Sequence, residues 1–331
     1  ASDVYKRQYL YFECNDTATM YIDDFEVRTA PVYQIQKDIP SLKDVYANDF
    51  KIGTAVTTEE LAPQSTKDLI AKHFNSITLG NELKPESILD KSATQASGSE
   101  TEPVINLASA RTILNYCRDN NIPVRGHVLV WHSQTPDWFF KENFDPNGAW
   151  VSKDKMTKRL ENYIKTVMET LAKDYPDVEF YAWDVVNEAA SDAGTIRDAG
   201  SNNEVNGQSA WVKVYGDQSY IPLAFEFAKK YAPAGCKLFY NDYNEYSPNK
   251  QAYIISDILK PLVEKNLIDG VGMQSHISMS YPTIDLYKSA MQQYADLGLE
   301  VQVTELDISE KSNEYADQLA LAQRYQDVFK M

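Results

Sequence analysis

The sequence is short of cysteine and of basic residues, and these shortages exclude several kinds of protein. Its three cysteines, Cys14, Cys117 and Cys236, lie far apart and form no C-x-x-C pair, so neither a zinc ribbon nor a disulfide framework is predicted. No stretch approaches the roughly 18 apolar residues that a membrane helix needs. Lys and Arg total 32 against 48 Asp and Glu, a net charge of −16, which would repel nucleic acid and anionic membranes. We therefore expect neither partner.

The chain does contain enough apolar sequence for one large core, since 43% of its 331 residues are hydrophobic. From Phe50 onward, segments typical of strands alternate with segments typical of helices. The predicted strands span residues 50–56, 76–79, 124–131, 179–186, 237–242, 270–275 and 300–304. The predicted helices span residues 58–74, 107–120, 152–175, 221–231, 250–266, 284–297 and 313–329. This alternation predicts a parallel sheet covered by helices.

Two folds could use such a sheet. A doubly wound open sheet usually has a glycine-rich first turn, but the segment after Phe50 has a single glycine and no G-x-G-x-x-G. We therefore predict a (β/α)8 TIM barrel over residues 50–331. Seven units are visible and the eighth is lacking, so we expect a chain of this length to be poorly stable and weakly active.

The N-terminal region has a different pattern. Residues 3–8 resemble a translated adapter sequence, which suggests a non-native start. Residues 9–28 are rich in aromatic and β-branched residues, typical of two strands around a turn. They resemble the closing strands of a β-sandwich carbohydrate-binding module, and an irregular extension is the alternative. Residues 1–30 are thus assigned to the start and this remnant, and residues 31–49 to a linker.

Two carboxylates follow apolar strands, at the positions where barrels hold catalytic groups. Glu188 comes directly after Asn187 at the end of the fourth strand, and Glu305 ends the seventh. A lone carboxylate after a strand is more often part of a loop or helix start. Two that converge on one barrel mouth are typical of a site that splits a glycosidic bond. A metal-dependent hydrolase is the other enzyme class, but the sequence has neither a His-x-His pair nor H-E-x-x-H, so no metal is predicted.

Five motifs resemble those of the retaining endo-β-1,4-xylanases of glycoside hydrolase family 10. They cover the third to seventh strands and occur in the family order, over nearly the whole chain from Phe50. The matching segments are residues 124–136, 183–189, 241–245, 272–276 and 303–307.

The resemblance implies a role for each matching residue and no cofactor. It makes Glu188 the general acid/base and Glu305 the nucleophile, with His276 and Asp307 supporting Glu305 and with Asn187 bonded to the sugar 2-hydroxyl. The remaining residues would bind substrate: Lys84, His127 and Trp131 on the glycone side, Asn81 and Gln134 one sugar further, Tyr243 and Asn244 on the leaving-group side, and Gln274. Xylan and xylo-oligosaccharides would be the substrates of a secreted protein that we expect to be a monomer.

The sequence departs from the family at two places near the glycone side. Gly80 stands where the family has a carboxylate that binds the distal sugar. Residues 90–103 form a polar stretch that we predict to be a mobile flap. Two alternatives to the xylanase remain open: a related barrel glycanase of cellulase or mannanase type, and a catalytically impaired carbohydrate-binding fragment.

Overall fold

The protein was analysed as a computed structural model, which describes residues 35–202, 207–310 and 314–331. The chain divides into a short unit, Ala1–Ile35, and a large unit, Gln36–Met331. The predicted adapter sequence and carbohydrate-binding remnant lie outside the described residues. All that follows concerns the large unit.

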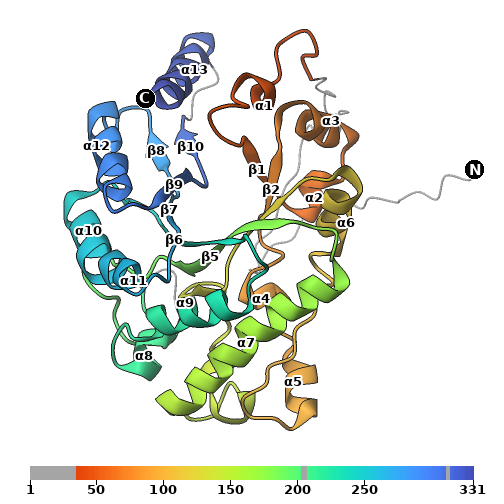
Figure 1. The fold of residues 1–331 in the computed structure, drawn as a ribbon, viewed down its shortest axis with the longest axis vertical. Coiled ribbons are helices and arrows are strands. Elements are labelled where there is room, and N and C mark those ends of the chain that lie inside the picture. Colours follow the sequence, from red (N-terminus) through yellow and green to blue (C-terminus); the bar gives the residue numbers. More distant parts are fainter. Residues whose placement is uncertain (1–34, 203–206, 311–313) are drawn as a thin grey trace, which may run out of the picture. The chain divides into compact units, whose positions relative to one another are not determined.

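A parallel sheet of eight strands forms the centre of this unit. Its order is β1-β2-β3-β5-β6-β7-β9, and β4 pairs with β5 off this path. Figure 1 shows the strands following one another in an arc, with helices on the outer side. The strands are β1 Gly53–Val56, β2 Ser76–Leu79, β3 Val124–Gly126, β4 Val130–Trp131, β5 Phe180–Asn187, β6 Lys237–Asp242, β7 Gly270–Met273 and β9 Glu300–Val303. Two short strands, β8 His276–Ser278 and β10 Asp307–Ser309, pair separately.

The helices alternate with these strands as the sequence predicts, although two predicted helices are not continuous α-helices and several short helices were not predicted. The predicted helix 58–74 is broken at Pro63, and the predicted helix 250–266 contains a π-helical segment. The helices are α1 Leu42–Val45, α2 Thr58–Leu61, α3 Gln64–His73, α4 Pro85–Ile88, α5 Lys91–Ser97, α6 Arg111–Asn120, α7 Lys153–Asp174, α8 Ala210–Tyr215, α9 Tyr220–Tyr231, α10 Pro248–Tyr253, η3 Ile254–Leu259, α11 Lys260–Glu264, α12 Ile284–Ala295 and α13 Tyr315–Lys330, with the 3-10 turns η1 Asp137–Phe140 and η2 Glu142–Phe144.

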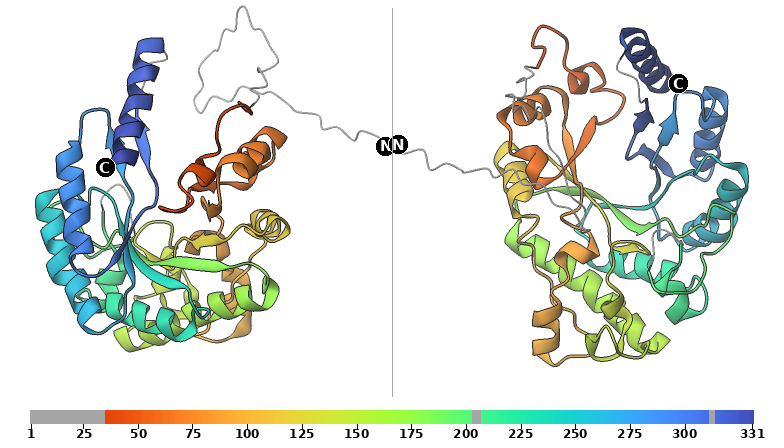
Figure 2. Two further views of the ribbon diagram at one scale, coloured as in Figure 1. Left: turned by 45° about the horizontal axis from the view of Figure 1, so that its top comes forward. Right: turned by 180° about the vertical axis from the view of Figure 1, so that it is seen from behind.

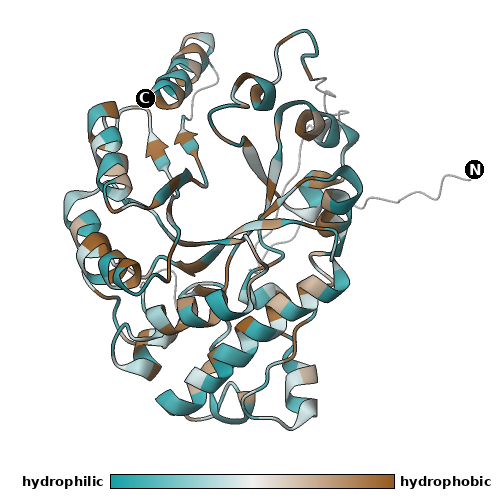
Figure 3. Cartoon of the chain, in the orientation of Figure 1, coloured by the Kyte–Doolittle hydropathy of each residue, from teal (hydrophilic) through white to brown (hydrophobic). Residues whose placement is uncertain are grey.

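Helix α7 shows why these segments fold as they do. The Ser152 hydroxyl accepts the Lys155 amide at 3.3 Å and caps the first turn. Met156, Leu160 and Ile164 recur at helical spacing and are buried in the hydrophobic core. Each large apolar side chain buried in this way stabilises the fold by about 1.5–3 kcal/mol. Figure 3 shows hydrophobic and hydrophilic residues alternating along the turns of this helix.

Strands β1 and β9 are the two edges of the sheet in the described part of the chain, because each pairs on one side. The fold is that of a (β/α)8 barrel, of which the described residues form seven consecutively paired strands. Aromatic rings from the beginning and the end of the large unit contact one another. The ring centroid of Phe329 in α13 lies 5.5 Å from that of Tyr46 and 6.2 Å from that of Phe50. Figure 2 shows α13 and α1 from two further directions.

Two predicted loops contain regular structure. Residues 36–49, predicted as part of a linker, belong to the large unit, and their helix α1 packs on α3, where the Leu42 amide donates to His73 Nδ1 at 3.3 Å. Residues 90–103, predicted as a polar flap, begin with helix α5. Asp90 caps α5 through the Ala93 amide, and Gly98 ends it with a φ of 71°. The flap prediction missed this helix because Asp and Gly are typical both of loops and of helix ends. Asp90 and Gly98 were interpreted as loop residues, whereas they cap the two ends of α5.

Candidate active site

Glu188 follows the last residue of β5 and leaves the strand in an unusual backbone conformation. Its φ is 54°, in the left-handed region that residues other than glycine rarely adopt. Its backbone is held at both ends, because the Glu188 amide donates to the Asn241 carbonyl at 2.9 Å and Arg197 Nε donates to the Glu188 carbonyl. Such strained positions persist where neighbouring contacts over-determine them, which occurs most often at functional sites.

Three side chains donate hydrogen bonds to the Glu188 carboxyl. Trp131 Nε1 lies 2.9 Å from Oε2, and Gln274 Nε2 and Asn187 Nδ2 lie 2.9 and 3.2 Å from Oε1. Burial nevertheless raises the pKa of Glu188, and the nearby charge of Asp242 raises it further. The environment of Glu188 therefore shifts it towards the protonated form, the direction that a general acid requires.

Glu305 lies between β9 and β10 and has the opposite electrostatic environment. Its Oε1 accepts from Asn241 Nδ2 at 2.8 Å, and its Oε2 is 3.3 Å from His276 Nε2. The other ring nitrogen of His276 is 2.7 Å from Asp307 Oδ2, because the β8–β10 register places these two residues opposite each other. Burial alone would raise the pKa of Glu305, but the His276 hydrogen bond, the charge of His127 and the Asn241 amide lower it to about 2.

The same pairing acts on the histidine. The Glu305 hydrogen bond raises the pKa of His276 to about 9, against the effect of burial, and Asp307 adds to the increase. The imidazole is thus positively charged at neutral pH and faces an ionised carboxylate. One carboxyl with a raised pKa beside a second with a lowered pKa is the arrangement needed for acid-assisted displacement at an acetal carbon.

A chain of amides connects the two carboxyls. Asn241 Nδ2 donates both to Glu305 Oε1 and, at 2.9 Å, to Asn187 Oδ1, while the Asn187 amide donates to Glu188. Asn241 comes from the end of β6, and Gly272 on β7 makes room for it, since a Cβ there would lie 2.2 Å from Asn241 Oδ1. The sequence prediction did not assign a role to Asn241, although its position at the end of a buried strand was a usable signal.

The residues predicted for the glycone side form one cluster. Lys84 Nζ donates to Asn81 Oδ1 and to Gln134 Oε1, both at 2.8 Å, and lies 5.2 Å from the centroid of the Trp131 ring. Glu82 shapes the loop that carries them, because its carboxylate accepts the amides of Thr58 and Asn81 at 2.7 and 3.0 Å. The structure therefore brings together four of the five residues that the sequence predicts for this side, and the ring of the fifth, His127, lies 6.3 Å from the Trp131 ring.

His127 follows β3 and is fixed from within the barrel. Its Nδ1 lies 3.0 Å from Asp184 Oδ2, and Asp184 also accepts from Arg125, which in turn donates to Gln302. All but Gln302 are buried, so this polar row ties the third, fourth and seventh barrel strands together. The sequence analysis did not predict the row.

Tyr243 and Asn244 follow β6, as predicted, and both contact Asp192. The Tyr243 hydroxyl donates to Asp192 Oδ2 at 3.2 Å, and Asn244 Nδ2 donates to Oδ1 at 3.4 Å. Lys250 Nζ lies 3.2 Å from the same Oδ1. Neither Asp192 nor Lys250 was predicted, because a loop aspartate and a helix lysine carry no motif that distinguishes them from surface charges.

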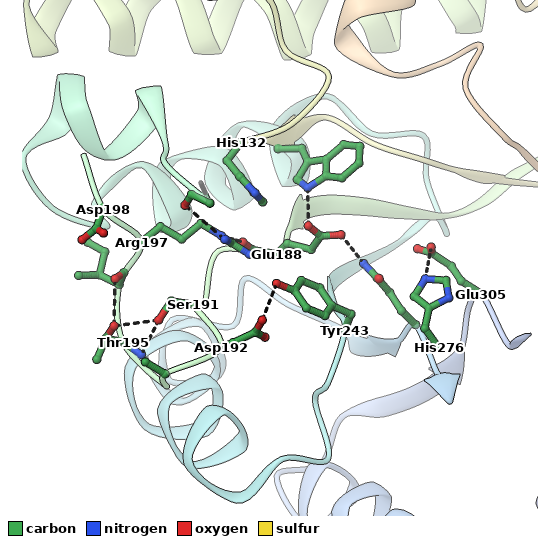
Figure 4. A pocket seen from close by; sticks show the side chains of 15 residues that line it. His132, Glu188, Ser191, Asp192, Thr195, Arg197, Asp198, Tyr243, His276 and Glu305 are labelled. Atoms are coloured by element: carbon green, nitrogen blue, oxygen red, sulfur yellow. Dashed lines mark hydrogen bonds and ion pairs between the residues drawn. The ribbon is translucent and has the colours of Figure 1, made fainter. Parts of the chain in front are cut away.

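A cleft of about 830 Å³ joins the candidate catalytic pair to this side of the barrel. Figure 4 shows Glu188 and Glu305 facing it, with the Tyr243 hydroxyl directed at Asp192. Its lining is Trp131, His132, Glu188, Ser191, Asp192, Ala193, Thr195, Ile196, Arg197, Asp198, Gly207, Tyr243, Gln274, His276 and Glu305. Burial lowers the pKa of His132 to about 3, so this histidine is neutral.

Within the described ranges, no group of three His, Cys, Asp or Glu side chains is placed to hold a metal ion. No described helix combines the length and the apolar character that crossing a membrane requires.

Comparison with known protein sequences identifies the family. The profile of glycosyl hydrolase family 10 matches residues 41–331. The chain is 48% identical over 296 residues to endo-1,4-beta-xylanase Y of Acetivibrio thermocellus, covering 87% of this chain and 27% of that protein. It is 47% identical over 293 residues to the bifunctional endo-1,4-beta-xylanase XylA of Ruminococcus flavefaciens, covering 88% of this chain and 29% of that protein. The chain therefore spans less than a third of the length of these two relatives.

Solved structures agree. The CBM22-1 and GH10 modules of a Clostridium thermocellum endo-1,4-beta-D-xylanase, complexed with xylohexaose, superpose with a TM-score of 0.81 at 46% identity, over 88% of this chain and 57% of that one. The intracellular xylanase of Thermoanaerobacterium saccharolyticum superposes with a TM-score of 0.76 at 36% identity, over 89% and 85% of the two chains. On the strength of the motifs, the barrel and these matches, the chain belongs to glycosyl hydrolase family 10.

Proposed function

We propose that the protein is a retaining endo-1,4-β-xylanase. The observation that carries this proposal is the pair of carboxyls, Glu188 and Glu305, joined through Asn241 and Asn187 at one barrel mouth, with the pKa of the first raised and that of the second lowered. Relatives 47% and 48% identical to this chain are named endo-1,4-beta-xylanases, which supports xylan as the substrate.

The first step uses both carboxyls. The Glu305 carboxylate attacks the anomeric carbon and forms a glycosyl ester, while the bond from that carbon to the bridging oxygen breaks. Glu188 gives its proton to this oxygen, so the leaving sugar departs as a neutral alcohol. The charge of Glu305 is lost in the ester, and the positive His276 beside it then favours an ionised Glu188.

The second step reverses these roles. The Glu188 carboxylate takes a proton from water, the water oxygen attacks the anomeric carbon, and the ester bond to Glu305 breaks. Two inversions leave the configuration at that carbon unchanged, which requires the two carboxyls about 5–5.5 Å apart. We infer that the Asn241 and Asn187 amides hold this spacing, because each is bonded to one of the carboxyls and to the other amide.

The surrounding side chains suit a chain of pyranose rings. Trp131 offers an aromatic edge beside the acid and Tyr243 an aromatic ring beyond it, and the apolar C–H faces of sugars pack on such rings. Lys84, Asn81 and Gln134 supply clustered polar groups for hydroxyls on the glycone side. The structural relatives were solved with xylohexaose and with xylotriose, which supports a site for several xylose units.

Reducing-sugar release from xylan, mannan and carboxymethylcellulose tests the substrate. Release from xylan alone is expected, and faster release from mannan or carboxymethylcellulose would favour the related glycanases. Binding of xylan without release would favour a catalytically impaired fragment. Proton NMR of the first product should show the β-anomer, and the α-anomer would exclude a retaining reaction.

Two substitutions test the assigned roles separately. Glu305→Ala should abolish turnover of every substrate, because it removes the carboxylate that forms the ester. Glu188→Ala should abolish xylan hydrolysis but leave formation of the glycosyl-enzyme from a 2,4-dinitrophenyl β-xylobioside, whose leaving group needs no proton. Equal loss on both substrates would show that Glu188 is not the acid.

Two further expectations accompany this function. We propose a secreted protein, because polymeric xylan is too large to enter a cell, although one structural relative is described as intracellular. We also propose a monomer, since one barrel carries both carboxyls and the whole cleft. Detection in the culture medium of the natural host, and light scattering after size-exclusion chromatography, test these two points.

A further inference from the structure

Behind two residues that line the cleft, Asp192 and Tyr243, lies a buried lysine that no step of the proposed reaction uses. The side chain of Lys250 is 0% exposed, whereas lysine is almost never fully buried unless it is paired. It lies in helix α10, which follows the Tyr243 loop. Removing a charge from water is costly, so the contacts that hold this ammonium in place require an explanation.

Three groups surround the Lys250 ammonium. Its Nζ lies 2.9 Å from Asp242 Oδ1, 3.2 Å from Asp192 Oδ1 and 3.5 Å from the centroid of the Tyr243 ring. Burial disfavours the charged form, but the carboxylates of Asp242 and Asp192 help to outweigh it, and the pKa of Lys250 is raised. The ammonium group therefore contacts the loop of Asp192, the end of β6 at Asp242 and the ring of Tyr243.

Asp242 and Asp192 differ in why they need this charge. The Asp242 side chain is 1% exposed, so its carboxylate needs a buried counterion. The Asp192 side chain is 61% exposed, and water alone could solvate it. The contact between Asp192 and Lys250 therefore orients Asp192 more than it neutralises it.

This orientation passes to Tyr243. The Tyr243 hydroxyl donates to Asp192 Oδ2 at 3.2 Å, while the ammonium of Lys250 lies against its ring. The side chain is thus held both at its hydroxyl end and at a ring face, and it also lines the cleft (Figure 4). A side chain ordered before the ligand arrives loses less conformational entropy on binding.

We propose that Lys250 is a positioning residue, which acts with Asp192 to hold Tyr243 as a fixed platform for the sugar that leaves. The proposal rests on the proposed xylanase function and deepens it. Substrates whose leaving group is a sugar should need this platform. A substrate whose leaving group is a small phenol should not.

The test compares two substrates in the same protein. Asp192→Asn is the first variant, because the exposed side chain can change without unfolding the barrel, and Tyr243→Phe is the second. For each, kcat/KM is measured on xylotetraose and on 4-nitrophenyl β-xylobioside. We expect about a tenfold loss on xylotetraose, equivalent to about 1.4 kcal/mol, and less than a twofold loss on the aryl substrate. The double variant should lose little more than either single one, because both break the same contact.

A matched control and a direct variant complete the design. Asp217 is 59% exposed and lies 3.5 Å from Lys153, so Asp217→Asn removes a similar exposed ion pair and should change neither substrate. Lys250→Met should show the same substrate split, read as the ratio of the two kcat/KM values, which does not depend on the amount of folded enzyme.

Each other outcome overturns a specific statement. If Asp192→Asn loses activity equally on both substrates, or loses none on xylotetraose, Tyr243 is not a platform held by Asp192 for the leaving sugar. Additive losses in the double variant would show that Asp192 does not act through Tyr243. A wild-type protein inactive on both substrates would instead overturn the proposed function, and the platform with it.

Discussion

Replacing Trp131 by Phe tests how the protein controls its candidate acid. The indole Nε1 donates to Glu188 Oε2 at 2.9 Å, and this bond lowers the pKa of Glu188 against the effect of burial. A hydrogen bond to a charged group contributes about 1.5–3 kcal/mol, and one pKa unit corresponds to about 1.4 kcal/mol. Gln274 Nε2 remains at 2.9 Å and water can enter the vacated space. We therefore expect the pKa of Glu188 to rise by about one unit.

The assay is the pH dependence of kcat/KM on xylotetraose between about pH 4 and pH 10. The reaction needs protonated Glu188, so activity falls as pH rises through its pKa. A higher pKa moves this basic limb of the profile to higher pH. The maximum rate will also fall, because Trp131 is predicted to contact substrate, but the position of the limb does not depend on that height.

Trp138→Phe is the matched control, since that indole is partly buried beside Phe144 and does not line the cleft. Its basic limb should coincide with that of the wild type. A basic limb that stays in place or moves to lower pH in Trp131→Phe would refute the reasoning. It would mean either that the bond does not stabilise the ionised form, or that Glu188 does not set the limb.

Three further substitutions test other parts of the site. Gly272→Ala places a Cβ 2.2 Å from Asn241 Oδ1 and so displaces the Asn241 side chain. We expect kcat/KM to fall by about a hundredfold, while the urea midpoint of unfolding moves modestly. Unchanged activity would show that the amide chain between the two carboxyls is dispensable. His276→Gln removes the main hydrogen bond that lowers the pKa of Glu305 to about 2, so the acidic limb of the pH profile should move up towards 4.5, and an unmoved limb would contradict this. Burial raises the pKa of Glu245 to about 8, so its carboxyl stays protonated in the fold and stability is lost as pH rises from 4.5 to 8. Urea unfolding should therefore find Glu245→Gln more stable than wild type by a few kcal/mol at pH 8, at about 1.4 kcal/mol per pKa unit, and equal to it at pH 4; the same difference at both pH values would exclude the titration.

One rule predicted where several candidate side chains lie: a polar residue that ends an apolar strand points into the barrel mouth. Glu188 and Gln274 directly follow β5 and β7, and both meet in the site. Asn241 obeys the same rule at the end of β6, yet its role emerges only from its two hydrogen bonds. The rule predicts that a side chain points into the barrel mouth and how near the strand end it lies. It does not predict which side chains form hydrogen bonds with one another.

Other parts of the site could not be read from the sequence, because they depend on the path of loops. Asp192 and Lys250 are 58 residues apart, and no periodicity relates a loop carboxylate to a helix ammonium across that distance. Likewise, the row from Gln302 through Arg125 to Asp184 spans 177 residues and depends on which strands face each other inside the barrel. Both are tertiary contacts that local propensity does not encode.

The pKa values of the two candidate catalytic carboxyls are shifted in opposite directions. The two shifts have different physical causes, and both causes arise from the barrel. Glu188 leaves the central strand β5, where burial opposes its charge more strongly than three hydrogen bonds support it. Glu305 leaves the edge strand β9, where the small β8–β10 sheet places His276 beside it. Asp307, 60% exposed, stabilises the imidazolium without being buried itself. In the free protein the pKa of the acid is therefore raised mainly by desolvation, and that of the nucleophile is lowered mainly by its pairing with His276. The amides of Asn241 and Asn187 fix the positions of both groups, while the two separate environments fix their protonation.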